Sequence, residues 1–156
     1  MSNTLDPSLV ITPFRPDDYE RWLPLWRGYQ SFYQTEIPDE TTKVTWSRIM
    51  DAAEPMWGAL ARRGGAPVGM VHWIFHRSNW TIGDYCYLQD LFVAPEVRGG
   101  GVGRALIEYV YAEARRAGSP RVYWLTHEGN AEAIRLYDRV ADRSGFIQYR
   151  KVLPGR

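Results

Sequence analysis

The chain has 156 residues, of which 45% are hydrophobic, and this is enough for one packed domain but too little for two ordinary ones. Its formal net charge of +1 gives no electrostatic basis for binding nucleic acid. No apolar run approaches the ~20 residues that cross a bilayer, so we expect a single domain over residues 1–156 without a membrane span.

Two features bear on the cellular compartment. The N-terminus, MSNTLDPSLVITPF, lacks the basic segment and the long apolar core of a signal peptide. Cys86 is the single cysteine and cannot form an internal disulfide. We therefore expect a cytoplasmic protein in which Cys86 is a small buried hydrophobe within a strand.

The first expected elements are a strand and an aromatic helix. Residues 9–14 are mainly apolar and predict a strand, and Asp17 and Asp18 are good residues to start a helix. Large side chains then recur at helical spacing, although Pro24 interrupts them: Trp22, Leu25, Trp26, Tyr29, Phe32 and Tyr33. Such a stripe usually belongs to the core, and part of it could also contact a substrate.

A polar connection follows the aromatic helix. Residues 34–42 contain the carboxylates of Glu36, Asp39 and Glu40, which form either a solvated loop or a rim that attracts a cationic amine. A second helix is expected from about 41 to 51.

A β-hairpin is expected next. Residues 56–62 and 68–75 predict two strands joined by a turn at 63–67. His72 and His76 would share one face of the second strand roughly 13 Å apart, which is too far to bind one metal ion. We therefore predict no metal site.

The central feature of the sequence is a strand followed by a glycine-rich loop and a helix. Residues 87–93, YLQDLFV, predict a buried strand, and residues 101–117 have the periodicity of an amphipathic helix. The loop between them contains Arg98, Gly99, Gly100, Gly101, Val102, Gly103 and Arg104. Amides without neighbouring Cβ atoms at a helix start can surround a phosphate group, and two arginines can add charge-assisted hydrogen bonds. The alternative is a simple glycine-rich turn.

Two common phosphate-binding motifs do not fit this loop. A P-loop requires Lys-Ser or Lys-Thr after its last glycine, but Arg104 and Ala105 follow Gly103. The G-x-G-x-x-G/A fingerprint ends on Leu106 or Arg104 instead of glycine or alanine. The loop therefore predicts neither a nucleoside triphosphate site nor a dinucleotide site.

The C-terminal part completes the expected elements. Gly118-Ser119-Pro120 ends the helix, and residues 121–126 predict a further strand. Residues 132–142 predict the last helix and residues 146–152 the last strand.

Two motifs resemble those of a known family. The R-x-x-G-x-G pattern at 98–103, directly after a strand that ends LFVAP, resembles the acetyl-CoA pyrophosphate motif of the GNAT superfamily of N-acetyltransferases. The segment 130–137 is similar to the family's N-x-x-A-x-x-x-Y segment, and Gly145-Phe146 to the start of its last strand. The resemblance implies an α/β (α+β) fold, with a central mixed, mostly antiparallel sheet of six to seven strands flanked by about four helices.

The resemblance also implies a set of contacts with acetyl-CoA. The thioester carbonyl is expected near the backbone N–H of Val93, and the sulfur near Tyr137. The residues that the family pattern assigns to this co-substrate are Leu91, Phe92, Val93, Arg98, Gly99, Gly100, Gly101, Val102, Gly103, Arg104, Asn130, Ala133 and Tyr137.

Acetyl transfer to an amine defines the catalytic roles. The reaction needs a neutral amine, a hydrogen-bond donor for the carbonyl oxygen and a proton for the departing thiolate. The N–H of Val93 would be the donor, and Tyr137 would supply the proton, since a tyrosine with its usual pKa of ~10 is protonated at pH 7. Asp90 or Glu128, acting through water, would be the general base. The alternative for Tyr137 is a core position on an amphipathic helix.

The acceptor of the acetyl group is expected to be a primary amine. Residues 87–93 most resemble the branch that acetylates polyamines, diamines and histone-type lysines, but Gln89 replaces a usual Glu and cannot pair with an ammonium group. We expect direct attack by a primary amine in a ternary complex. The residues expected to contact this substrate are Trp26, Tyr33, Glu36, Gln89 and Asp90. An amino acid or antibiotic acceptor, and an acyl-CoA sensor without turnover, are the alternatives.

A homodimer is also expected. Members of this branch commonly pair, and the aromatic-rich N-terminal half carries more apolar surface than one small domain easily buries. The expected partners are therefore a second copy and a small-molecule or peptide amine, with no nucleic acid and no membrane.

Overall fold

The computed structural model describes residues 7–155. The chain divides into two compact units, the first ending at Leu125 and the second beginning at Thr126. The expectation that the chain starts without a signal peptide concerns in part residues 1–6, which lie outside the described residues. A single domain over the whole chain stays a prediction.

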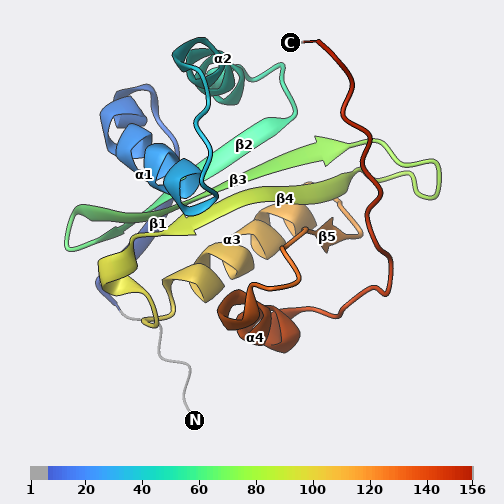
Figure 1. Ribbon diagram of the computed structural model, residues 1–156. Coiled ribbons are helices and arrows are strands. Elements are labelled where there is room, and N and C mark those ends of the chain that lie inside the picture. The colour runs from blue at the N-terminus through green and yellow to red at the C-terminus, as the bar shows by residue number, and fades with distance from the viewer. Residues whose placement is uncertain (1–6, 156) are drawn as a thin grey trace. The chain divides into compact units, whose positions relative to one another are not determined.

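The first unit is built on a five-stranded sheet (Figure 1). Its strands are β1 (Leu9–Pro13), β2 (Met56–Arg63), β3 (Ala66–His76), β4 (Tyr85–Val93) and β5 (Val122–Tyr123). They lie in the order β1-β2-β3-β4-β5, and the first four are antiparallel to their neighbours. β5 pairs parallel with β4, which is possible because a helix connects these two strands.

Helices cover both faces of this sheet (Figure 1). α1 (Tyr19–Phe32) and α2 (Asp39–Met50) lie on one face, and α3 (Val102–Arg116) lies on the other. The short 3-10 helices η1 (Pro16–Asp18) and η2 (Pro95–Val97) precede α1 and the glycine loop. α1 continues through Pro24, so the expected interruption does not occur. Among the described residues, no helix has the length and apolar character needed to span a bilayer.

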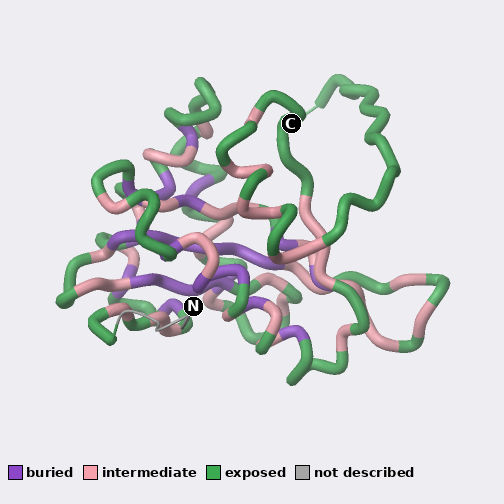
Figure 2. Tube along the Cα trace, turned by 90° about the horizontal axis from the view of Figure 1, so that it is seen from below, coloured by how far each residue is buried: buried purple, intermediate pink, exposed green. Residues whose placement is uncertain are grey.

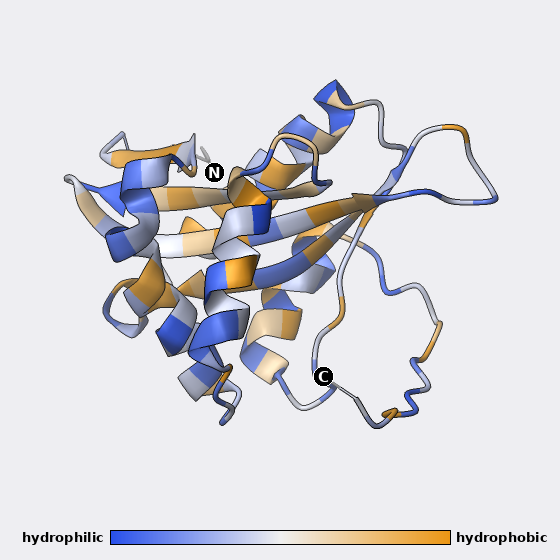
Figure 3. Cartoon of the chain, turned by 90° about the horizontal axis from the view of Figure 1, so that it is seen from above, coloured by the Kyte–Doolittle hydropathy of each residue, from blue (hydrophilic) through white to orange (hydrophobic). Residues whose placement is uncertain are grey.

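One hydrophobic cluster of the first unit lies between α1 and the sheet. Trp22 is fully buried, and Leu25 and Trp26 are almost so, together with Leu60 and Met70 of the sheet. Figure 2 shows buried backbone concentrated on the central strands, and Figure 3 shows that the helices carry both hydrophobic and hydrophilic residues. The first part of the aromatic stripe is therefore core, as its periodicity indicates, whereas Phe32 and Tyr33 at its end are about half exposed.

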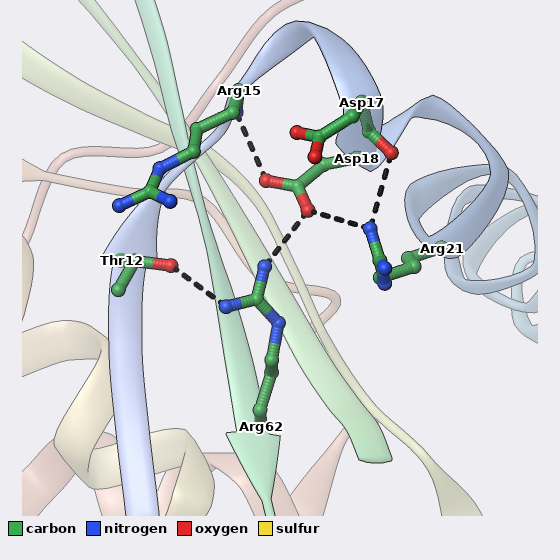
Figure 4. Close-up of polar contacts among 6 residues, drawn as sticks. All are labelled: Thr12, Arg15, Asp17, Asp18, Arg21 and Arg62. Carbon is green, nitrogen blue, oxygen red and sulfur yellow. Dashed lines mark hydrogen bonds and ion pairs between the residues drawn. The ribbon is translucent and has the colours of Figure 1, made fainter. Parts of the chain in front are cut away.

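A buried carboxylate fixes the start of α1 (Figure 4). Asp18 is 1% exposed and accepts hydrogen bonds from the backbone N–H of Arg15 at 2.9 Å and from Nη2 of Arg62 at 2.8 Å. Arg21 adds a longer contact of 3.4 Å, and Arg62 also donates to Thr12 at 3.4 Å. Because a buried charge is tolerated only when it is paired, this cluster connects α1 to β1 and β2 and sets where α1 crosses the sheet.

Cys86 lies in the core of β4 and is fully buried. Burial raises the pKa of its thiol to about 12, so it carries almost no thiolate at neutral pH. The prediction of a small buried hydrophobe is confirmed.

The prediction of six to seven strands is wrong for the described residues, which form five. β5 is shorter than the expected strand at 121–126, and residues 146–152 form no strand. Phe146, Ile147 and Tyr149 are all more than three-quarters exposed. Their composition favours a strand, but strand formation also requires a neighbouring strand, and the second unit contains none.

Candidate functional site

The glycine loop has the backbone geometry of an anion site. Gly99 and Gly101 have left-handed φ values of 84° and 85°, and Gly101 is the N-cap of α3. A Cβ atom added to either glycine would meet no atom within 4 Å, so the space above the loop is open. The first N–H groups of α3 have no intrahelical acceptors and are available to a ligand. This loop therefore has the backbone arrangement that can bind a phosphate group.

The two arginines that flank the glycine loop, Arg98 and Arg104, make different contacts. Nε of Arg98 donates to the backbone oxygen of Val93 at 3.1 Å, and its guanidinium lies over the rings of Phe32 and Phe92 at 5.4 and 5.5 Å. Nε of Arg104 donates to Glu108 one turn along α3 at 3.0 Å. Arg98 thus connects the glycine loop to the end of β4 and to α1.

A third arginine lies at the loop and was missed in the sequence. A Cβ atom added to Gly100 would lie 3.5 Å from Nη1 of Arg63, the last residue of β2. The hairpin turn after Arg63 gives no local sign of this proximity, because it depends on how the sheet packs against the loop. Arg63 adds positive charge where phosphate groups are expected.

A β-bulge in β4 forms the centre of the site. Asp90 pairs with His72 of β3, whereas the next pair along β3 joins Trp73 to Leu88, so Gln89 is the extra residue. Gln89 and Asp90 both line one cavity. Bulges redirect side chains and are common beside active sites, and here one brings two successive polar side chains to the same cavity.

The end of β4 presents a backbone donor away from β3. The N–H of Ala94 donates to the oxygen of Val68 at 2.8 Å. In an antiparallel ladder such pairs alternate, so the N–H of Val93, opposite Gly69, points away from β3. β5 pairs only with Cys86 and Tyr87, and no strand of the described residues pairs with Val93 on that side. The Val93 N–H is thus available to a substrate carbonyl.

The cavity lies between α1, α2 and strands β2 to β4, and its volume is about 260 Å³. Its walls are formed by Trp26, Tyr29, Ile37, Thr41, Thr45, Ile49, Met56, Trp57, His72, Trp73, Ile74, Gln89 and Asp90. Most of these side chains are aromatic or aliphatic, Asp90 is the one carboxylate among them, and none is a lysine or an arginine. Such a cavity favours a cation with an apolar body.

Asp90 is surrounded by side chains that can donate hydrogen bonds to it. Nδ1 of His72 lies 3.0 Å from its Oδ2. The hydroxyl of Tyr29 hydrogen-bonds to the same carboxylate, and the pKa of Tyr29 is raised by burial first and then by the charge of Asp90 and this hydrogen bond. Burial and the charge of Asp90 also raise the pKa of Tyr33. Both tyrosines therefore stay protonated at neutral pH, and Tyr29 remains a donor.

The structure brings several predicted substrate residues together. Trp26, Gln89 and Asp90 line the cavity, and Tyr33 lies close enough to Asp90 to be affected by its charge. Glu36 is exposed and is not among the residues that line the cavity. No group of three or more potential metal ligands occurs within residues 7–155.

Two residues of the cavity were missed or misread. The sequence places Tyr29 in an aromatic stripe that usually belongs to the core and could in part contact a substrate, but its spacing from Trp26 gives no sign of Asp90. For His72 the sequence excludes a metal site shared with His76 and suggests no other role, whereas the structure places it in contact with Asp90 across the β3–β4 pairing.

The second unit holds the remaining predicted residues, on α4 (Ala131–Val140) and directly before it. Asn130 is its N-cap, and Nδ2 of Asn130 lies 3.4 Å from Oγ1 of Thr126. Ala133 and Tyr137 follow at spacings of three and four, so all three share one face of the helix. Glu128 is exposed in the turn before α4. Their roles with acetyl-CoA and the amine stay predictions.

Comparisons with known proteins identify the family of this chain. Residues 19–141 match the acetyltransferase (GNAT) family. The chain is 37% identical to a D-amino-acid N-acetyltransferase of Saccharomyces cerevisiae, over 92% of this chain and 90% of the relative. It is 35% identical to an aminoalkylphosphonate N-acetyltransferase of Salmonella typhimurium, over 60% of this chain and 61% of the relative. Among solved structures, an aminoglycoside N-acetyltransferase in complex with CoA has a similar fold, with a TM-score of 0.73, 19% identity and coverage of 95% of this chain and 93% of that chain.

Proposed function

We propose that this chain, which belongs to the acetyltransferase (GNAT) family and is an acetyl-CoA-dependent N-acetyltransferase, acetylates the primary amino group of a small molecule held beside Asp90. The observation that supports this most is the cavity itself. It has a single carboxylate, supplied by the bulge of β4, and the same strand leads directly into the glycine loop.

The proposed roles follow from the chemistry of the groups. When bound, acetyl-CoA supplies a thioester, so that the N–C bond of the product amide forms as the C–S bond breaks and the thiol is released. Asp90 takes one proton from the ammonium group of the acceptor, and the Val93 N–H donates to the carbonyl oxygen. Tyr137 gives its hydroxyl proton to the thiolate, and the second proton that the amine loses returns to the Tyr137 oxygen, so that the one proton released overall is the one taken by Asp90. Gly99–Arg104 and Arg63 bind the phosphates.

Amino acids are the first acceptor class to test. A relative 37% identical to this chain is a D-amino-acid N-acetyltransferase. The polyamine, diamine or lysine-type acceptor expected from the sequence becomes the second class, because Glu36, Asp39 and Glu40, which would bind its remote ammonium groups, are exposed and outside the cavity. Thiol release with acetyl-CoA and a panel of D- and L-amino acids, spermidine, a diamine, an aminoglycoside and a basic peptide would separate these classes. An acyl-CoA sensor would bind acetyl-CoA and release no thiol.

The glycine loop gives a prediction for co-substrate affinity. Gly101→Asp and Gly101→Asn add side chains of the same size at the same left-handed residue, but only aspartate places a negative charge at the start of α3. We expect calorimetry to show at least tenfold weaker acetyl-CoA binding for the aspartate variant than for the asparagine variant, a difference of ~1.4 kcal/mol. Equal affinities in the two variants would exclude the phosphates from this loop.

Gln89 gives a prediction for acceptor choice. Gln89→Glu would place a second carboxylate next to Asp90 in the cavity. We expect kcat/KM to rise about tenfold for a diamine and to fall for an amino acid, whose own carboxylate is repelled. Gln89→Met, which has a similar length and no charge, is the matched control and should not discriminate between the two substrates in this way. Parallel changes for both substrates in the glutamate variant would place Gln89 outside the acceptor site.

The homodimer expected from the sequence remains part of the proposal. It is supported by large apolar side chains exposed on the first unit, including Trp80 at 90% and Ile82 at 100% in the connection between β3 and β4.

A further inference from the structure

His72 lies between two buried polar groups from different elements. It is 4% exposed in the middle of β3, and α1 lies over β3 and β4 (Figure 1). The indole Nε1 of Trp22 lies 2.9 Å from Nε2 of His72, and Nδ1 of His72 lies 3.0 Å from Oδ2 of Asp90. These two contacts form a chain from the core of α1 to the carboxylate in the cavity.

The direction of these two hydrogen bonds follows from which groups can donate. An indole N–H can donate but cannot accept, so Nε2 of His72 must be the acceptor and carries no proton. The single ring proton of the neutral imidazole then lies on Nδ1 and is donated to Asp90. Trp22 is fully buried and stacks on Trp26 with 5.8 Å between ring centroids, so its N–H is held in this position.

The other titratable groups around Asp90 leave it as the charged group of the cavity. Tyr29 of α1 and Tyr33, directly after α1, both interact with Asp90, and Tyr87 of β4 lies near Tyr29. The residues that α2 and β2 contribute to the cavity walls are uncharged. A protonated imidazole would cancel the negative charge of Asp90, whereas a neutral donor orients the carboxylate and leaves its charge for an ammonium group.

We propose that His72 is a positioning residue that holds Asp90 through its Nδ1–H tautomer, which Trp22 selects, so that the carboxylate stays ionised and directed to take the proton of the acceptor amine. The role of Asp90 rests on the function proposed above, whereas the tautomer of His72 does not. The competing explanation is that His72 is only a buried polar residue whose hydrogen bonds are satisfied.

Two amide variants separate these explanations. In His72→Asn the amide nitrogen can lie near the position of Nδ1 and donate to Asp90, but nothing reaches Trp22. In His72→Gln the amide lies near the position of Nε2 and can accept from Trp22, but the donor to Asp90 is lost. Both variants place an uncharged amide in the same buried strand, so a purely structural role predicts similar activity for both.

The pH dependence of kcat/KM is the first readout. We expect the acidic limb in His72→Gln to move to higher pH by about one unit, so that kcat/KM below the limb falls about tenfold, because a carboxylate without its donor is harder to keep ionised. His72→Asn should keep the limb of the wild type, and the KM for acetyl-CoA should change in neither variant. Identical profiles for the two variants would overturn the proposal.

The second readout needs no substrate and no activity. In the wild-type protein, ¹⁵N NMR of the histidine ring should show a proton on Nδ1 and none on Nε2, and Trp22→Phe should allow the Nε2–H form. A ring protonated on Nε2 in the wild type overturns the proposal even if amines are acetylated or if a variant fails to fold. A wild-type protein that acetylates no amine rejects the proposed function instead, whatever the ring spectrum shows.

Discussion

Asparagine in place of Asp90 is expected to lower kcat/KM for amine acetylation by about 10²–10⁴-fold at neutral pH, the usual contribution of a positioned general base. Asparagine keeps the size of the side chain, and its oxygen can still accept from His72 and Tyr29. The amide cannot take a proton, so the fold should be kept while proton transfer is lost. Steady-state kinetics with the best acceptor of the panel measure this loss.

The pH dependence of the Asp90→Asn variant shows whether Asp90 acts in proton transfer or in amine binding. The deficit should shrink at high pH, because an amine with a pKa near the ~10.4 of lysine then loses its proton without a base. Asp84→Asn is the matched control, since this carboxylate pairs with Arg77 at 3.1 Å and lies outside the cavity, and it should leave kcat/KM near the wild-type value. A deficit that is the same at every pH would assign Asp90 to amine binding and not to proton transfer.

Local patterns were enough to predict most of the first unit. The amphipathic spacing from Trp22 to Tyr33 predicts α1, and the glycine-rich loop at 99–103 predicts where α3 begins. Helical periodicity and glycine conformation depend on residues that are close in the sequence, so the sequence alone reveals them. The strand that carries Gln89 and Asp90 could be predicted for the same reason.

The surroundings of Asp90 could not be predicted in this way. His72 is 18 residues from Asp90 and 50 residues from Trp22, and their contacts depend on the register of β3 with β4 and on how α1 packs. A shift of one residue in that register would turn His72 to the opposite face, and no local pattern reports it. The strand expected at 146–152 does not form. Its residues have a local preference for strand, but no strand of the described residues lies beside them to pair with.

Phenylalanine in place of Tyr137 is expected to slow the chemical step by about 10²–10⁴-fold while acetyl-CoA affinity stays nearly intact. The change removes only the hydroxyl from α4 and leaves the ring that shares a helix face with Asn130 and Ala133. A thiolate that leaves without a proton is a poorer leaving group, so the loss should appear in kcat and in single-turnover rates. Calorimetry of acetyl-CoA binding provides the comparison with affinity.

The matched control for this variant is Tyr149→Phe, which removes a hydroxyl from a tyrosine of the second unit that is 90% exposed. It should leave the rate unchanged. If Tyr137 is the acid, the wild-type rate should also decline as the pH approaches the ~10 at which a tyrosine hydroxyl ionises, and the phenylalanine variant should lack this decline. Equal single-turnover rates for the wild type and Tyr137→Phe would show that Tyr137 is only a packing residue. Another donor, such as water, would then have to protonate the thiolate.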